Sequence, residues 1–177
     1  HVPDDDQQAD MGEVVRSELF SAGFERYEIS NYAKGGKRAR HNLLYWHGGD
    51  YLGLGVGASG FTRTGDGRTG LRYANKRAPE FWLEDLEAGR LSEKDRESLD
   101  ATDLFHERIF TGLRLVEGLD LDDLAARTGH DPRPSRSEEL ERWNSQGFAT
   151  FDGRRVALTT RGLELHTELA TRLAAFD

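Results

Sequence analysis

Cysteine is absent from all 177 residues of the chain. This excludes disulfide bonds, and it excludes any zinc site or iron–sulfur cluster held only by thiolates of this chain. A protein without cysteine is also suited to a reducing compartment, so we expect a cytoplasmic location.

Long apolar runs are absent as well. No stretch of about 18 apolar residues occurs, so the sequence predicts no membrane span. The first residues are polar and acidic, unlike a secretory signal peptide. The chain opens on His1 rather than methionine, and the aspartates at 4–6 are residues that favour a helix N-terminus. We therefore expect a helix to begin there, in a C-terminal piece of a longer protein.

Charge is what the sequence has in abundance. Charged residues make up 32% of the chain, the formal net charge is −8, and 36% of residues are hydrophobic. This composition predicts a soluble, acidic protein with enough apolar residues for one or two small domains.

The first third of the chain predicts one helix and two strands. Residues 6–22 carry apolar side chains at helical spacing, and Gly23 is a suitable helix stop. Residues 24–29 alternate apolar and charged, so helix and strand together predict one step of a parallel α/β sheet. We expect residues 31–49 to form a loop. Residues 51–56 predict a second strand, whose alternate glycines indicate close backbone approach.

A hairpin and a helix are predicted next. Residues 60–73 have a turn signal at Gly65, Asp66 and Gly67. Pro79 is placed to start a helix and Gly89 to end it. Charged helical patterns follow, so we expect a domain boundary between about residues 73 and 92.

The last part of the chain predicts three helices, at 103–115, 121–128 and 135–146. A two-stranded hairpin follows over residues 148–158, with Asp152 and Gly153 as its turn. Thr159 or Thr160 is expected to cap a final helix. Three helices followed by a two-stranded wing indicate a winged-helix-like domain.

Several groups of residues resemble a known family, the oxygen-independent coproporphyrinogen III oxidase-like radical S-adenosylmethionine (SAM) proteins. The resemblance lies in residues 25–33, in Arg40 to Asn42 with Tyr45 and Trp46, and in residues 49–55. The His-Asn-x-x-Tyr-Trp spacing at 41–46 is the mark of that family's heme chaperone branch. Residues 110–119 and 158–163 resemble its C-terminal domain, so the similarity covers nearly the whole chain.

The resemblance implies a mixed fold, α+β and α/β. It would contain the last strands and helix of a partial (β/α) radical SAM barrel, then a helical, winged-helix-like C-terminal domain. Residues 1–75 would belong to the barrel, 76–102 would be connecting helices, and 103–177 would form the C-terminal domain. The family's full-length proteins hold a [4Fe-4S] cluster and SAM, and three cysteines of a CxxxCxxC motif bind the cluster. That motif is not in this chain, so we expect no catalysis by the chain alone.

The resemblance also implies a heme-binding segment formed by His41, Asn42, Tyr45 and Trp46. A histidine nitrogen is a common axial ligand of heme iron, so His41 is the candidate iron ligand. Tyr45 and Trp46 offer aromatic faces that can stack on a porphyrin. The alternative is structural: Asn42 caps a turn, and the two aromatic residues fill the end of a barrel.

Arg38 and Arg40 flank this segment and are suited to pair with heme propionates. His47 is a second candidate ligand that the family motif does not fix. The remaining histidines, His106, His130 and His166, lie on or beside predicted helices without a recognised metal spacing.

A second site is implied by the glycine segment. The family's usual Ala-His-Ser is replaced here by Ala58, Ser59 and Gly60. From the resemblance, a SAM contact is assigned to Gly57, Ala58 and Ser59. The glycine alternation itself is not a dinucleotide fingerprint, because the third glycine is not where that motif requires it.

The function implied is a heme chaperone that binds heme and delivers it to acceptor proteins. One alternative is a radical SAM oxidase acting on coproporphyrinogen, and another is an acidic winged-helix module that docks a protein. Nucleic-acid binding is not expected, because residues 103–177 hold ten arginines against fourteen carboxylates. Unpaired sheet edges in a partial barrel predict that the chain can dimerise.

Overall fold

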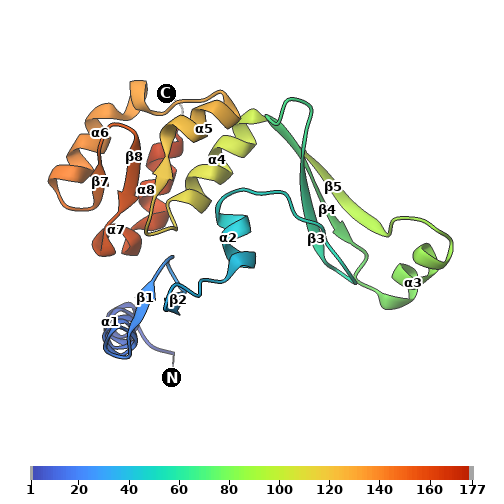
Figure 1. Cartoon of the computed structure of the whole chain (residues 1–177), viewed down its shortest axis with the longest axis horizontal. Coiled ribbons are helices and arrows are strands. Elements are labelled where there is room, and N and C mark those ends of the chain that lie inside the picture. The colour runs from blue at the N-terminus through green and yellow to red at the C-terminus, as the bar shows by residue number, and fades with distance from the viewer. Residues whose placement is uncertain (1, 176–177) are drawn as a thin grey trace.

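A computed structural model describes residues 2–175 as a mixed α/β fold with three small sheets. Three parts are visible in Figure 1: an N-terminal helix with a two-stranded sheet, a projecting arm, and a larger C-terminal domain. A short helix, α2, lies between them beside α4 of the C-terminal domain. Every strand pairing in the described part of the chain is antiparallel.

The N-terminal part begins with helix α1, Asp5–Ser21, as predicted. Asp4 and Gln7 form a capping box at its start, and Gly23 follows its end at φ +81°. Strand β1, Phe24–Arg26, pairs antiparallel with β2, Tyr32–Lys34. The chain reverses after three residues and pairs with its own continuation, so no parallel partner of β1 lies within residues 2–175 and the predicted parallel α/β step stays a prediction.

Helix α2, Arg40–Trp46, occupies a segment that we expected to be a loop. The sequence did not predict this helix because its N-cap residue, Ala39, has no side chain that can cap it, so the usual signal for a helix start is missing. Residues 51–56 are not the predicted strand either, since only Tyr51 forms a β-bridge, with Phe61. Gly55 at φ +99° and Gly57 at φ +68° turn the backbone away from an extended conformation.

The arm is a three-stranded sheet in the order β3-β4-β5. Strands β3, Ser59–Thr64, and β4, Thr69–Asn75, form the predicted hairpin. Helix α3, Pro79–Glu87, starts at the predicted proline and lies at the tip of the arm (Figure 1). Strand β5, Glu93–Leu99, then returns along β4, so residues 76–102 hold a strand as well as the helix we expected. Its highly charged, exposed side chains suit an edge strand.

A buried carboxylate holds the tip of the arm together. Asp85 of α3 receives hydrogen bonds from Arg90 at 2.8 Å and from Ser92 at 3.0 Å, and pairs with Lys76 at 2.5 Å. These partners, Lys76 first, lower the pKa of Asp85 to about 2. The carboxylate therefore stays charged and fixes α3 to the ends of the two strands beside it.

The C-terminal domain contains the helices and the hairpin predicted for it. Its helices are α4, Ala101–Gly112; α5, Leu121–Thr128; α6, Arg133–Ser145; α7, Thr160–Glu164; and α8, His166–Ala174. Its sheet has the order β6-β8-β7, formed by β6, Leu119–Asp120; β7, Ala149–Phe151; and β8, Arg155–Leu158. Thr159 caps α7 as expected, but the predicted final helix is interrupted at Leu165.

The main hydrophobic core lies within this domain. Leu and Ile side chains of α4, α5, α6 and α8 are fully buried there, together with Trp143 and Val156. A smaller core of Phe61, Leu99 and Leu104 joins the arm to α4. Because burial of such side chains is the dominant stabilising term, the C-terminal domain is the most strongly stabilised part of the chain.

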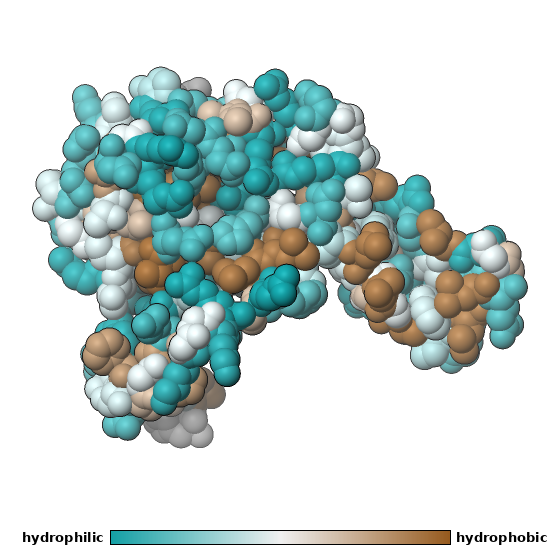
Figure 2. Space-filling view, in the orientation of Figure 1, coloured by the Kyte–Doolittle hydropathy of each residue, from teal (hydrophilic) through white to brown (hydrophobic). Residues whose placement is uncertain are grey.

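Large apolar side chains are exposed elsewhere. Figure 2 shows hydrophobic surface on the arm and along the underside of the C-terminal domain. On the arm the exposed apolar residues include Leu54, Phe81 and Leu91. Among residues 2–175, no helix combines the length and apolar character needed to cross a bilayer. Dimerisation through these faces stays a prediction.

Candidate functional site

Helix α2 presents His41 and Tyr45 one turn apart. The Nε2 atom of His41 lies 2.9 Å from the Tyr45 hydroxyl oxygen, and the two rings meet edge to face with centroids 4.7 Å apart. Residues four apart share one face of a helix, which is why the motif spacing brings them together. His41 is exposed and Tyr45 is half-buried, so the imidazole is accessible while its orientation is fixed.

A row of aromatic rings continues from this pair towards the arm. The rings of Tyr45 and Tyr51 meet edge to face with centroids 4.5 Å apart, and the centroid of the Tyr51 ring lies 6.1 Å from that of Phe61 in β3. Burial raises the pKa of Tyr51, although Arg72 opposes this effect. The row links α2 to the core of the arm, and it was not predicted because Tyr51 was assigned to a strand.

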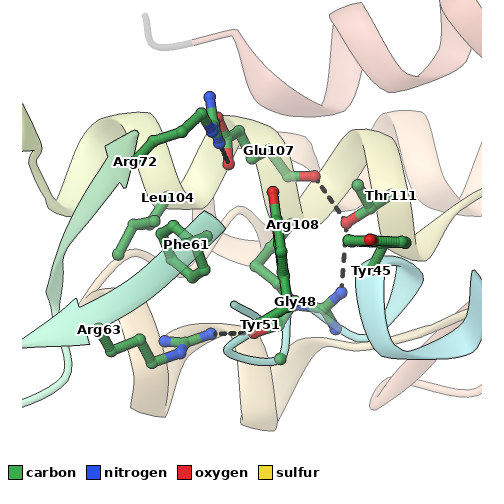
Figure 3. A pocket seen from close by; sticks show the side chains of 11 residues that line it. Tyr45, Gly48, Tyr51, Phe61, Arg63, Arg72, Leu104, Glu107, Arg108 and Thr111 are labelled. Carbon is green, nitrogen blue, oxygen red and sulfur yellow. Dashed lines mark hydrogen bonds and ion pairs between the residues drawn. The ribbon is translucent and has the colours of Figure 1, made fainter. Parts of the chain in front are cut away.

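A small cavity of about 120 Å³ lies beside this row, between the end of α2, strand β3 and helix α4. Figure 3 shows Tyr45, Tyr51 and Phe61 around it, with Arg72 turned towards Glu107. Arg72 Nη2 donates to both Glu107 carboxylate oxygens, at 2.5 and 2.7 Å. Ligand pockets usually exceed about 300 Å³, so this cavity is too small for a porphyrin. His41 does not line this cavity, so a large ligand at His41 would lie outside it.

The Trp46 side chain, at the end of α2, packs against Arg114. The guanidinium carbon of Arg114 lies 4.3 Å from the centre of its indole ring. Its Nε1 atom is buried without a hydrogen-bond partner among the described residues. Its backbone carbonyl accepts a hydrogen bond of 2.7 Å from Arg108 Nη1. Asn42 lies half-buried within the first turn of α2 and is not at its cap, which is Ala39.

The neighbouring cations have different surroundings. Arg38 Nη1 and His47 Nε2 both lie near the carboxylate of Glu117, at 3.4 and 3.5 Å. Arg40 is exposed on α2, and no carboxylate pairs with it in the part of the chain that the structure describes. The structure thus leaves Arg40 available beside His41, whereas Arg38 and His47 share an acidic partner.

The residues assigned to a SAM contact lie on the arm, apart from His41. Gly57 lies beside Arg77, and its amide donates to the Lys76 carbonyl at 3.0 Å. The Ala58 carbonyl accepts from the Asn75 amide at 2.8 Å, and Ser59 begins β3. The structure therefore does not bring the two predicted sites together, and these backbone groups are used within the arm.

Two other histidines, His130 and His166, make contacts within the C-terminal domain. His166 Nε2 lies 2.8 Å from the carbonyl oxygen of Phe110, and burial lowers its pKa. His130 lies beside the Phe105 ring, with centroids 5.4 Å apart. Within residues 2–175, no group of three or more acidic or histidine side chains is arranged to hold a metal ion.

Helix α6 carries a small cluster of three arginines, at positions 133, 136 and 142, and all three make internal contacts. Arg133 pairs with Asp122 and Asp131, and Arg142 lies 3.6 Å from Glu139. Arg136 donates to the carbonyl of Ala175 at 2.8 Å. These contacts neutralise much of the cluster, and the absence of nucleic-acid binding stays a prediction.

One important pair was missed by sequence reasoning. Glu28 is fully buried, with 0% exposure, and its Oε2 accepts hydrogen bonds from Arg114 Nε at 3.2 Å and Nη2 at 2.8 Å. The sequence predicted only that Glu28 belongs to a strand of alternating apolar and charged residues. No local pattern indicates its partner, which lies 86 positions along the chain.

Comparison with known proteins defines the class first. Residues 99–165 match the HemN C-terminal domain family. The fold also matches coproporphyrinogen III oxidase (HemN) from Escherichia coli, a radical SAM enzyme, with a TM-score of 0.68. That match covers 98% of this chain and 42% of the enzyme at 15% identity, so it is a likeness of fold. Relatives that are 36% and 39% identical over most of this chain, described next, show that it belongs to the coproporphyrinogen III oxidase-like radical SAM family, which confirms the resemblance found in its sequence.

More particularly, the chain is similar to proteins named heme chaperone HemW. It is 36% identical to HemW of Mycobacterium tuberculosis over 160 residues, 90% of this chain and 37% of that protein. It is 39% identical to HemW of Escherichia coli over 152 residues, 84% of this chain and 38% of that protein. Radical S-adenosyl methionine domain-containing protein 1 of Danio rerio is 34% identical over 67% of this chain and 27% of its own length. The chain thus spans well under half the length of these relatives.

Proposed function

We propose that this chain is part of a heme chaperone that binds heme on helix α2, with His41 as the iron ligand, and passes it to acceptor proteins. Similarity to proteins named heme chaperone HemW supports the class of function. The observation that carries the site is the accessible His41 imidazole, held in one orientation by the Tyr45 hydroxyl.

The residues of α2 fit a heme. Metal-bound histidines commonly use their second ring nitrogen in a hydrogen bond that fixes the tautomer. At His41 the Nε2 atom has this role with Tyr45, so Nδ1 is the nitrogen left for iron. Arg40, exposed on the same helix, is suited to pair with a propionate. Since the adjoining cavity is only about 120 Å³, heme at His41 would be surface-bound, which suits cargo that must be released.

The rest of the assignment follows the family. In the full-length protein we propose a partial (β/α) barrel that holds a [4Fe-4S] cluster and SAM, followed by a winged-helix-like domain formed by α4 to α8. Gly57, Ala58 and Ser59 would contribute to the SAM site. A cytoplasmic location is part of the same proposal.

A heme titration followed by Soret absorbance tests the site in this chain. His41→Ala should lose the histidine-ligated spectrum. Tyr45→Phe should keep the spectrum but bind heme about 10-fold more weakly, because it loses only the partner of the ligand. His47→Ala is the matched control: it removes another exposed imidazole, six residues away, and should resemble the wild type. Identical spectra for wild type and His41→Ala would rule out His41 as the ligand.

A radical SAM oxidase acting on coproporphyrinogen is the second candidate, favoured by the match of residues 99–165 to the HemN C-terminal domain. An assay of the full-length protein with its cluster and SAM separates the two. Decarboxylation of coproporphyrinogen would favour the oxidase, whereas heme binding without decarboxylation would favour the chaperone.

A further inference from the structure

We propose that Arg114 positions the heme-binding helix by clamping Trp46 against the protein, and that Trp46 is an anchor of α2 and not a porphyrin-stacking residue. The inference deepens the proposed function and rests on it for the heme measurements. Its structural part concerns Arg114, its contacts with Trp46 and Glu28, and the contact of Arg108 with Trp46.

The first support is the position of the Trp46 ring. Arg114 covers one face of the indole at 4.3 Å, a distance typical of cation–π contact. The Nε1 atom is buried and contacts no acceptor among residues 2–175. Trp46 is only partly exposed, with one face covered and its polar edge enclosed, so its ring offers little surface to a ligand. Trp46 would stack on a porphyrin only if α2 left its place.

The second support is the anchoring of Arg114. Its Nε and Nη2 atoms both donate to Oε2 of Glu28, and the other carboxylate oxygen accepts from the Ser30 amide at 2.8 Å and Asn31 Nδ2 at 2.6 Å. Glu28 is completely buried and also forms a β-bridge with Leu115. If Arg114 turned away, the buried Glu28 carboxylate would be left without a compensating cation, which is unfavourable. Arg114 is therefore held in this orientation.

The third support is the weakness of α2 itself. The helix has seven residues and no side-chain cap at its start, and isolated helices of this length are unstable in water. Arg108 donates to the Trp46 carbonyl at 2.7 Å, where a cation complements the negative end of the helix. Arg108 and Arg114 therefore both fix α2 through Trp46, and His41 and Tyr45 are presented on the turns that precede this anchor.

Hydrogen–deuterium exchange tests the clamp without heme. Arg114→Ala should speed amide exchange in residues 40–47 about tenfold or more, because a cation–π contact and a buried ion pair are lost. Exchange in residues 119–175 should not change. Trp46→Phe keeps a ring beneath Arg114 and should exchange like the wild type, whereas Trp46→Ala should resemble Arg114→Ala. The double variant should exchange no faster than Arg114→Ala, because the contact between Arg114 and Trp46 is already lost in that single variant.

The matched control is Arg161→Ala. Arg161 also lies over an aromatic ring, that of Phe148, at 4.9 Å from its centroid, but it belongs to α7, which Figure 1 shows apart from α2. It should leave exchange in residues 40–47 unchanged. Equal exchange of residues 40–47 in wild type and Arg114→Ala would overturn the clamp, and so would acceleration spread evenly over the C-terminal domain.

Heme release gives the functional measurement. Arg114→Ala should release heme to an excess of a high-affinity apoprotein about tenfold faster, with the Soret maximum unchanged because His41 is still present. Trp46→Phe should release heme at the wild-type rate. Slower release from wild type than from Trp46→Phe, with unaltered Arg114→Ala, would instead make Trp46 a porphyrin contact. A wild-type chain that binds no heme would refute the proposed function, while hydrogen exchange would still decide the clamp.

Discussion

Gly162 lies directly against the carbonyl oxygen of Phe148, so close that an added Cβ atom would overlap it. That carbonyl also accepts the Thr159 amide at 3.0 Å, which fixes the start of α7 to the end of the strand pair. Gly162→Ala should therefore destabilise the C-terminal domain by about 2 kcal/mol or more, because the backbone must move to admit the methyl group. Urea denaturation followed by circular dichroism measures the loss.

Gly12→Ala is the matched control for that substitution. Gly12 lies within α1, and an added Cβ would have no atom within 4 Å. It should stabilise α1 by roughly 0.5–1 kcal/mol, since alanine favours a helix more than glycine does. An unchanged unfolding midpoint in Gly162→Ala would show that the α7 contact is looser than described.

Gly48→Ala should disturb the end of α2. Gly48 has φ +61°, and an added Cβ would lie 2.5 Å from Cδ of the buried Arg108. Gly36, at φ +71° with no atom within 4 Å of an added Cβ, provides a control for the backbone cost alone. We expect Gly48→Ala to speed amide exchange in residues 40–47 more than Gly36→Ala does. Equal effects of the two would contradict the close packing of Arg108 on Gly48.

The acid stability of the C-terminal domain should depend on Asp120. Its Oδ1 caps α5, and its Oδ2 accepts from Arg154 at 2.9 Å. The Arg154 hydrogen bond and the backbone amides of the cap lower the pKa of Asp120 to about 2. A lowered folded-state pKa stabilises the protein above the unfolded pKa of about 4, and this stability is lost as the pH falls towards 2.

Asp120→Asn isolates this effect, because asparagine is an equally good N-cap but carries no charge. The variant should be less stable than the wild type at pH 6, and the difference should shrink between pH 4 and pH 2. Thermal melts at several pH values measure it. A difference that stays constant over this range would show that the charge of Asp120 does not contribute.

His166 should make stability fall as the pH is lowered through a milder range. Burial lowers its folded-state pKa below the usual value of about 6.5, so the unfolded chain binds the proton more tightly. Stability is then constant well above pH 6.5 and decreases below it. His166→Gln keeps a donor for the Phe110 carbonyl and removes the titration, so its stability should change less between pH 7.5 and 5.5. Parallel pH profiles for the two proteins would contradict this.

Local signals in the sequence were enough for most elements. Capping residues, Gly23, Pro79 and the Asp-Gly turn at 152–153 act over a few residues, and the structure places helices and turns there. Helix α2 has no such signal, because it is formed by contacts with Arg108 and Arg114 far along the chain. Residues 51–56 show the opposite error: an alternating pattern predicted a strand, but the positive φ angles of Gly55 and Gly57 prevent one.

The candidate site was predicted only in part, because some of its contacts are local in the sequence and others are not. The spacing of His41 and Tyr45 is a helical repeat, so once α2 exists their contact follows from sequence. The place of Trp46 does not follow, since it depends on Arg114 and, through it, on Glu28. A motif states which residues occur together, whereas only the fold determines which of them face a ligand.

The dependence of α2 on contacts from later in the chain sets an order of events during synthesis. His41 and Tyr45 leave the ribosome before Arg108 and Arg114, and a seven-residue helix without a cap does not form by itself. The imidazole and hydroxyl are therefore paired only after α4 and the segment beyond it have been made and folded. In a nascent or truncated chain these residues would be present without their native arrangement. The ability to bind an iron porphyrin would therefore arise only once the C-terminal domain has folded.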